Sequence, residues 1–171
     1  LTLGLDAWWT DDTSRVSGAR VTSADSLVAP PPPARAVSAY LFGNQDEAGA
    51  RLAMRLLREG FRVGAATRPI VAGGRSYPPG TFVARIQRNP PSLHERIAAL
   101  GREVRTPVTA VQSAFPDSGQ HGVGSSAVTT LHPPRVILAA GDGVNLTSFG
   151  ALWFYFEREL GLPVTPVELA S

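Results

Sequence analysis

The sequence predicts an α/β fold: a three-layer sandwich with helices on both faces of a mostly parallel sheet, plus a small β insertion. Two short apolar runs, at 36–42 and 135–140, are each followed by a helix-length segment and a further strand-like run. A helix between two strands is typical of a right-handed parallel crossover. Repeated crossovers are typical of a parallel sheet covered on both faces. Apolar residues make up 43% of the 171 residues, which is enough to bury a core.

The first crossover begins with the apolar run 36–42, which suits a buried strand. A capping box is expected next, with Asn44 at the start of the helix and Glu47 reaching back to it. The core face of this helix is predicted to carry Ala48, Leu52, Ala53, Leu56 and Leu57. The return strand is then expected at 61–66.

Residues 70–86 are predicted to form the β insertion. Gly73-Gly74 marks one turn and 77–80 marks another. Residues 81–86 are rich in β-branched and aromatic side chains, so a strand is expected there.

A second helix is expected after the insertion. Ser92 and Glu95 have the spacing of another capping box. The core side of this helix is predicted to carry Leu93, Ile97, Leu100 and Val104. A short strand is predicted at 108–111, and the Gly- and Ser-rich stretch 113–133 is predicted to be a long loop.

The last crossover, 134–168, repeats the same order of elements. A buried strand is predicted at 135–140, a turn at 141–145 and a final strand at 163–167. The helix between them is predicted to bury Phe149, Leu152, Trp153, Phe156 and Leu160.

The chain is expected to divide into an extended lead-in at 1–34 and an α/β domain at 35–171. Four consecutive prolines at 30–33 favour a stiff polyproline spacer at the end of the lead-in. Trp8 and Trp9 are interpreted as packing against the domain, with a sugar-binding platform as the alternative.

Composition argues against several partners and chemistries. No apolar run approaches the roughly 20 residues of a membrane-spanning helix, and no signal peptide is visible at the N-terminus. All 16 basic residues are Arg and are spread among acidic residues, so no nucleic-acid-binding strip is expected. Because there is no Cys, disulfides, a thiolate nucleophile and a Cys-ligated zinc site are excluded.

The three His residues are not spaced as metal ligands. His94, His121 and His132 each lack a ligand partner one helical turn or one pleat away, so no metal is expected in this chain. Ser125 could pair with His121 as a catalytic dyad, but no strained Gly-x-Ser-x-Gly turn presents it. An independent hydrolase is therefore only the third hypothesis, and no catalytic residue is assigned.

The turn after the predicted strand 135–140 is the best candidate for a ligand site. Ligands of open parallel sheets bind beyond the carboxyl ends of the strands, and the first amides of a helix can hold an anion. The candidate residues are Gly141, Asp142, Gly143, Asn145, Thr147 and Ser148. A small-molecule or anion-binding module is thus the second hypothesis. The alternative is a tight turn in which Asn145 or Thr147 only caps the helix.

Several segments together resemble a known family. They are, in chain order, 77–83 (YPPGTFV), 134–138 (PRVIL), 141–144 (GDGV), 148–153 (SFGALW) and 162–167 (LPVTPV). The set is similar to the region downstream of the catalytic domain in large bacterial zinc carboxypeptidases of the carboxypeptidase A type. In that family the last crossover looks like the opening of a class I glutamine amidotransferase-like domain. The resemblance spans most of the chain and implies a flavodoxin-like or glutamine amidotransferase-like sandwich.

The resemblance implies a non-catalytic accessory or interaction domain of a zinc carboxypeptidase-like protein. The family's His-x-x-Glu zinc pair, distant zinc His, substrate-binding Arg and Glu base have no counterpart in this chain, and a glutaminase would need a nucleophilic Cys. No cofactor is therefore expected here, and zinc is expected only in the parent's protease domain, the implied partner in cis. A homo-oligomer is left open. The parent would be exported, which implies an extracytoplasmic location.

Overall fold

Five strands form one sheet in the order β6-β1-β5-β2-β7, and every neighbouring pair is antiparallel. The strands are β1 (Ala39–Phe42), β2 (Gly64–Ala66), β5 (Phe82–Arg85), β6 (Val108–Val111) and β7 (Val128–Thr130). The computed structural model describes residues 29–169 except 46, 117, 118 and 120, together with the single residues 9, 11, 12 and 17.

Two helical crossovers are interleaved in this sheet. Helix α1 (Glu47–Arg58) connects β1 to β2, and helix α2 (Leu93–Glu103) connects β5 to β6. Since β1 and β2 are each antiparallel to β5, they run parallel to each other with β5 between them. In the same way β5 and β6 run parallel with β1 between them. This is the connectivity of the split βαβ arrangement.

The predicted three-layer sandwich with a mostly parallel sheet is therefore wrong. Both crossovers exist, but each skips one position, and the skipped position is filled by a strand running the other way. Strand β5, which was assigned to the insertion, is the central strand of the sheet. Helix periodicity indicates a crossover but does not indicate how many strands it passes, because pairing joins residues far apart in the chain.

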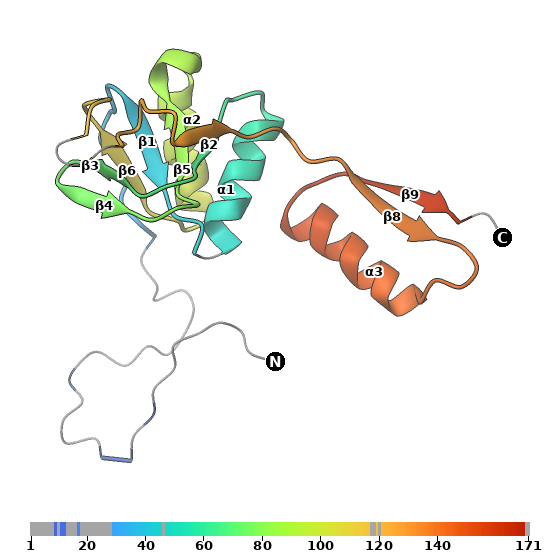
Figure 1. Cartoon of the computed structure of the whole chain (residues 1–171). Helices are drawn as coiled ribbons and strands as arrows, with labels where there is room; N and C mark the ends of the chain where they lie inside the picture. Colours follow the sequence, from blue (N-terminus) through green and yellow to red (C-terminus); the bar gives the residue numbers. More distant parts are fainter. Residues whose placement is uncertain are drawn as a thin grey trace.

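Both helices cover the same face of the sheet (Figure 1). Alternate residues of a strand point to opposite faces, so Tyr40 and Phe42 of β1 pack against the helices while Leu41 packs on the other side. The helix-side core also contains Leu52, Ala53, Leu56 and Leu57 of α1 and Leu93, Ile97 and Leu100 of α2. The predicted core faces of both helices are confirmed, with Ala48 and Val104 half-buried at their edges.

The second face of the sheet is covered by a hairpin and a loop. Strands β3 (Ile70–Ala72) and β4 (Arg75–Tyr77) pair with each other, and Gly73-Gly74 forms their turn, as predicted, with φ of 57° and 71°. Ile70 lies in a second buried cluster with Val83, Val123 and Ala127. The predicted loop 113–133 therefore contributes to the core and contains edge strand β7, which pairs with β2.

Neither predicted capping box is present as expected. Helix α1 is described from Glu47 and Gln45 is a bend outside it, so Asn44 does not directly precede the helix; residue 46 lies outside the described residues. Ser92 has helical backbone angles and its side chain makes no capping hydrogen bond. The amides of Leu93 and His94 instead donate to the carbonyls of Pro90 and Pro91, at 3.0 and 3.3 Å. The two prolines thus supply the turn that starts α2, after the short 3-10 helix η3 (Ile86–Arg88).

The last crossover forms a separate unit beside the sheet (Figure 1). Strand β8 (Val136–Ala140) is parallel to β9 (Val164–Glu168), and the segment between them contains α3 (Leu146–Phe154) and one π-helical turn, η4 (Tyr155–Glu159). The predicted strand–helix–strand order is confirmed. The unit does not join the five-stranded sheet, however, and is called the C-terminal unit below; residues 36–131 are called the body. Among the described residues, no helix has the length and apolar character needed to cross a membrane.

Candidate functional site

The predicted ligand-binding turn forms the connection from β8 to α3. Gly141 and Gly143 have positive φ, and the Asn145 Oδ1 atom accepts a hydrogen bond of 2.9 Å from the Ser148 amide. Asn145 is therefore the N-cap of α3, with extended backbone angles. The cap occupies one of the amides that an anion would need, and the structure thus contains the capping arrangement that was the alternative interpretation.

The surroundings of the turn are acidic. Strand register places Ala140 beside Glu168 of β9, and the Glu168 side chain lies against Gly141. Asp142 and Thr147 are exposed on the turn. Two nearby carboxylates disfavour an anion in this position because like charges repel. Ligand binding at residues 141–148 remains a prediction.

His94 and Ser125 each make a hydrogen bond within the body. His94 accepts or donates a 2.8 Å hydrogen bond through Nδ1 to the Tyr40 hydroxyl, which also accepts from the Ala36 amide. Burial lowers the pKa of His94 below its usual range, and the charge of Arg35 lowers this pKa further. Ser125 Oγ donates to the Gly122 carbonyl at 2.8 Å and so belongs to a turn. Within the described part of the chain, no cluster of three His, Cys, Asp or Glu residues could hold a metal ion.

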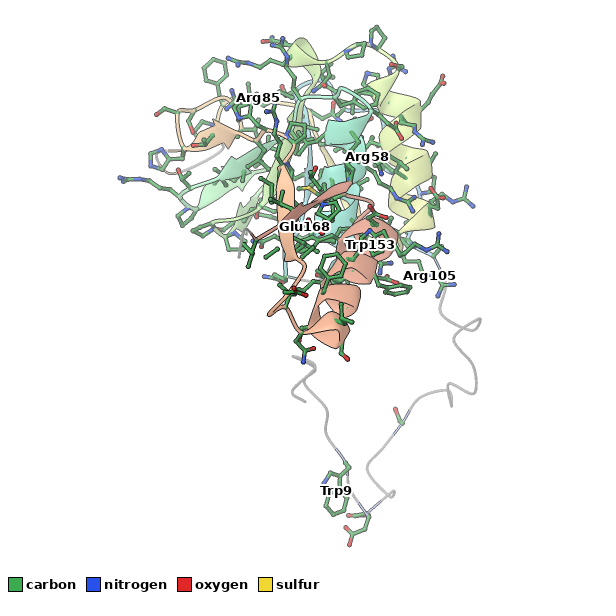
Figure 2. All side chains as sticks on the ribbon, turned by 90° about the vertical axis from the view of Figure 1, so that its right-hand side faces the viewer. Trp9, Arg58, Arg85, Arg105, Trp153 and Glu168 are labelled. Carbon is green, nitrogen blue, oxygen red and sulfur yellow. The ribbon has the colours of Figure 1, made fainter. Side chains whose placement is uncertain are left out.

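The C-terminal unit carries a large apolar surface. Its exposed members, which we call the open surface, are Ile137, Leu146, Leu152, Trp153, Phe154, Tyr155 and Val167. The prediction that α3 is a buried helix is wrong, because no residue of α3 or η4 is buried. Phe149, Phe156 and Leu160 are half-buried. Figure 2 shows Trp153 on α3, where 48% of the residue is exposed.

Ile137 and Val167 of the open surface are exposed because only one face of the β8–β9 pair is covered, whereas the other members lie on α3 and η4. Val136, Leu138 and Ala140 alternate with Ile137 and Ala139, and the second set is exposed. Val167 pairs with Ala139 in the register and lies on the same uncovered face. Parallel strands are normally covered on both faces, and a pair of strands alone is at best marginally stable. One face of the β8–β9 pair therefore presents the apolar side chains of Ile137 and Val167.

The two edges of the β8–β9 pair differ. The Leu169 amide donates to the Ala140 carbonyl at 3.1 Å. Because successive peptide groups of a strand point to opposite sides, the nitrogen of Pro166 points away from β8, to the outer edge of β9. Proline has no N–H to donate, so it interrupts that edge. The outer edge of β8 carries the peptide groups of Ile137 and Ala139 and has no such interruption.

The junction between the C-terminal unit and the body is charged rather than apolar. Glu159 forms an ion pair with Arg51 of α1, and Arg58 lies close to Gly161. A hollow of about 410 Å³ at this junction is lined by Arg55, Arg58, Glu59, Arg96, Glu103, Arg158, Glu159 and Gly161. Charged interfaces of this kind are typical of weak contacts between the parts of a chain. The apolar open surface is not used in this junction.

Sequence reasoning missed the open surface, although a signal was present. The α3 sequence, LTSFGALWF, is apolar on every side and has no charged residue. A helix of that kind needs partners all round, whereas the crossover alone supplies one sheet face. Trp9 also departs from expectation, since 91% of it is exposed and it does not pack against the domain; Trp8 lies outside the described residues.

Comparison with protein-family models, with curated proteins and with solved structures finds no match to this chain.

Proposed function

We propose that this chain is a non-catalytic accessory domain of a zinc carboxypeptidase-like protein, and that its C-terminal unit binds the remainder of that protein in cis. The observation that carries the proposal is the open surface. The family itself enters through the sequence resemblance alone. In this proposal the zinc ion and the extracytoplasmic location belong to the parent protein.

The energetics favour a bound partner at the open surface. Complete burial of a Leu or Phe side chain is worth about 1.5–3 kcal/mol, and Leu152, Phe154 and Trp153 are each close to half exposed or more. Large exposed apolar surface marks interaction sites in soluble proteins, and here it lies on α3 and η4 and on the uncovered face of β8–β9. The charged junction with the body leaves this surface available.

Strand addition at β8 is the binding mode that fits the edges. A partner strand beside β8 would bond to the outward-facing peptide groups of Ile137 and Ala139, which pair with no described strand, as in other cases of strand addition. Addition beside β9 would leave the partner carbonyl opposite Pro166 without a donor.

A partner in cis fits better than a second copy of the chain. Antiparallel pairing of two copies through β8 would place both α3 helices on the same face. Ile137 and Val167, on the other face, would remain exposed. A partner segment could instead continue from β9 and add a parallel strand at the outer edge of β8. Crossovers between parallel strands are right-handed, so the helix of that connection would cover the face that carries Ile137 and Val167. One connected segment could therefore cover both the edge and the face.

Amide hydrogen exchange tests this proposal. The amides of Ile137 and Ala139 should exchange quickly in the 171-residue chain and slowly in the full protein encoded by its gene. The amide of Glu168, on the outer edge of β9, should exchange quickly in both. Equal exchange at Ile137 and Ala139 in the two proteins would count against the interaction, and protection of Glu168 alone would place the partner on the wrong edge.

A pair of variants provides a matched control. Ile137 and Val37 are 67% and 68% exposed, but Val37 precedes β1 and lies outside the open surface. Ile137→Asp should lower the thermal unfolding midpoint of the full protein by several degrees, because a charge would be buried in the interface. Val37→Asp should change that midpoint little. The reading frame gives a separate check of parentage: a His-x-x-Glu pair and a later His upstream of this region are expected.

A further inference from the structure

A polar cleft lies on the hairpin side of the body, where β1 ends. Its volume is about 410 Å³, within the range of small-molecule sites in proteins. The lining residues come from the end of β1 and the loop after it, from β4 and its turn into β5, and from the start of β6. Three segments far apart in the chain therefore meet around one hollow.

The polar side chains of this cleft have no partners within the described part of the protein. They are Asn44, Gln45, Arg75, Ser76, Tyr77, Thr106 and Thr109, and none of their side-chain groups makes a hydrogen bond or ion pair with another described residue. Thr81 differs, since its hydroxyl donates to the Pro78 carbonyl at 2.7 Å. Asn44, Gln45, Arg75 and Ser76 are exposed, whereas Thr106 is 2% exposed. The polar groups around the cleft are therefore positioned to bind a ligand.

The chemistry of the lining indicates the class of ligand. Amides and hydroxyls such as those of Gln45 and Ser76 can both donate and accept hydrogen bonds, which suits a ligand rich in hydroxyl groups. Arg75 is the single charged residue among the described residues of the lining, and guanidinium binds carboxylates through two parallel hydrogen bonds. Tyr77 and Pro78 add flat apolar surfaces, against which the C–H face of a sugar ring can pack.

We propose that this cleft binds a saccharide unit that carries a carboxylate, with Arg75 holding the carboxylate and the surrounding hydroxyls and amides holding the ring. This site is separate from the open surface of the C-terminal unit, and it does not depend on the proposed accessory role.

Nuclear magnetic resonance titration of the 171-residue chain with D-glucuronate tests the site. The amides of Gln45, Ser76 and Thr106 should shift together and reach saturation. D-Glucose, which lacks the carboxylate, should bind about tenfold more weakly or worse, as expected for the loss of one charge-assisted hydrogen-bond pair. Acetate, which lacks the ring, should also bind more weakly than D-glucuronate.

Variants of two exposed arginines complete the experiment. Arg75→Ala should raise the Kd for D-glucuronate about tenfold, to near that of D-glucose, while Arg68→Ala, outside the cleft, should leave it unchanged. The proposal is overturned if D-glucuronate causes no saturable shift, or if the shifts map elsewhere. It is also overturned if acetate or an acetylated dipeptide binds as tightly as D-glucuronate, since the site would then recognise a carboxylate or a peptide and not a sugar.

Discussion

The carboxylate of Glu159, in the π-helical turn after α3, pairs with the guanidinium of Arg51 on α1. Arg51 also bonds Glu47 one helical turn away at 2.9 Å, so one arginine serves two carboxylates. About a third of each side chain of the Arg51–Glu159 pair is exposed, and partly exposed pairs are worth only about 0–1 kcal/mol. The C-terminal unit is therefore held to the body weakly. The Arg51–Glu159 pair sets where the unit lies on the body and adds little to the free energy of unfolding.

Glu159→Gln should release the C-terminal unit without unfolding the body. The free energy of unfolding of the body should change by less than about 1 kcal/mol. Trypsin cleavage after Arg135, in the segment that joins the two parts, should become faster. Glu103→Gln is the control, because it breaks the Arg55–Glu103 pair between α1 and α2 instead. Equal cleavage rates in the two variants would show that Glu159 does not hold the unit.

Ile97→Ala and Leu152→Ala should differ strongly in the isolated chain. Ile97 is a fully buried residue of α2, so the cavity left by the substitution should cost about 2–5 kcal/mol in urea unfolding. Leu152 is 47% exposed on α3, and its loss should cost under about 1 kcal/mol. In the full parent protein, the cost of Leu152→Ala should rise toward that of Ile97→Ala. A large cost for Leu152→Ala in the isolated chain would mean that the open surface is already covered there.

Two helical glycines should respond in opposite ways to the same change. A Cβ atom at Gly49 would collide with the Gly43 carbonyl oxygen, so Gly49→Ala should destabilise the body by about 1–3 kcal/mol. No atom lies near the equivalent position at Gly150 of α3. Gly150→Ala should therefore increase helix stability by up to about 1 kcal/mol. Thermal unfolding followed by circular dichroism measures both, and a stabilising effect of Gly49→Ala would contradict the close approach of α1 to the end of β1.

His94 should make stability depend on pH below neutrality. Its pKa is lowered in the folded protein, by burial first and by Arg35 second, so the unfolded chain binds the proton more tightly. Stability should fall as pH drops from about 6.5 toward the folded-state pKa, and this contribution should be absent above that window. Urea midpoints measured between pH 5 and 8 should show the fall. His94→Gln, which keeps a hydrogen-bond partner for Tyr40, should flatten the curve. An unchanged curve in this variant would exclude His94 as its source.

The candidate sites show which functional features a sequence pattern can reveal. The turn at 141–148 was found because its residues are adjacent in the chain, and Asn145 caps the helix as one of the two interpretations expected. The polar cleft was missed because Gln45, Ser76 and Thr106 come from separate segments. No local spacing links them before the strands are paired.

The sequence by itself determined the local elements. The apolar runs at β1 and β8, the buried faces of α1 and α2, the Gly73-Gly74 turn and the last strand–helix–strand unit all follow from periodicity or turn chemistry, which act over a few residues. Tertiary structure alone decided which strands become neighbours: β5 entered the centre of the sheet, β7 joined its edge, and β8 and β9 stayed outside it. Burial depends on those neighbours. Helix α2 is amphipathic and buries its one apolar face against the sheet. Helix α3 is apolar on every side and keeps exposed apolar residues, because packing against distant segments, and not local propensity, supplies the cover.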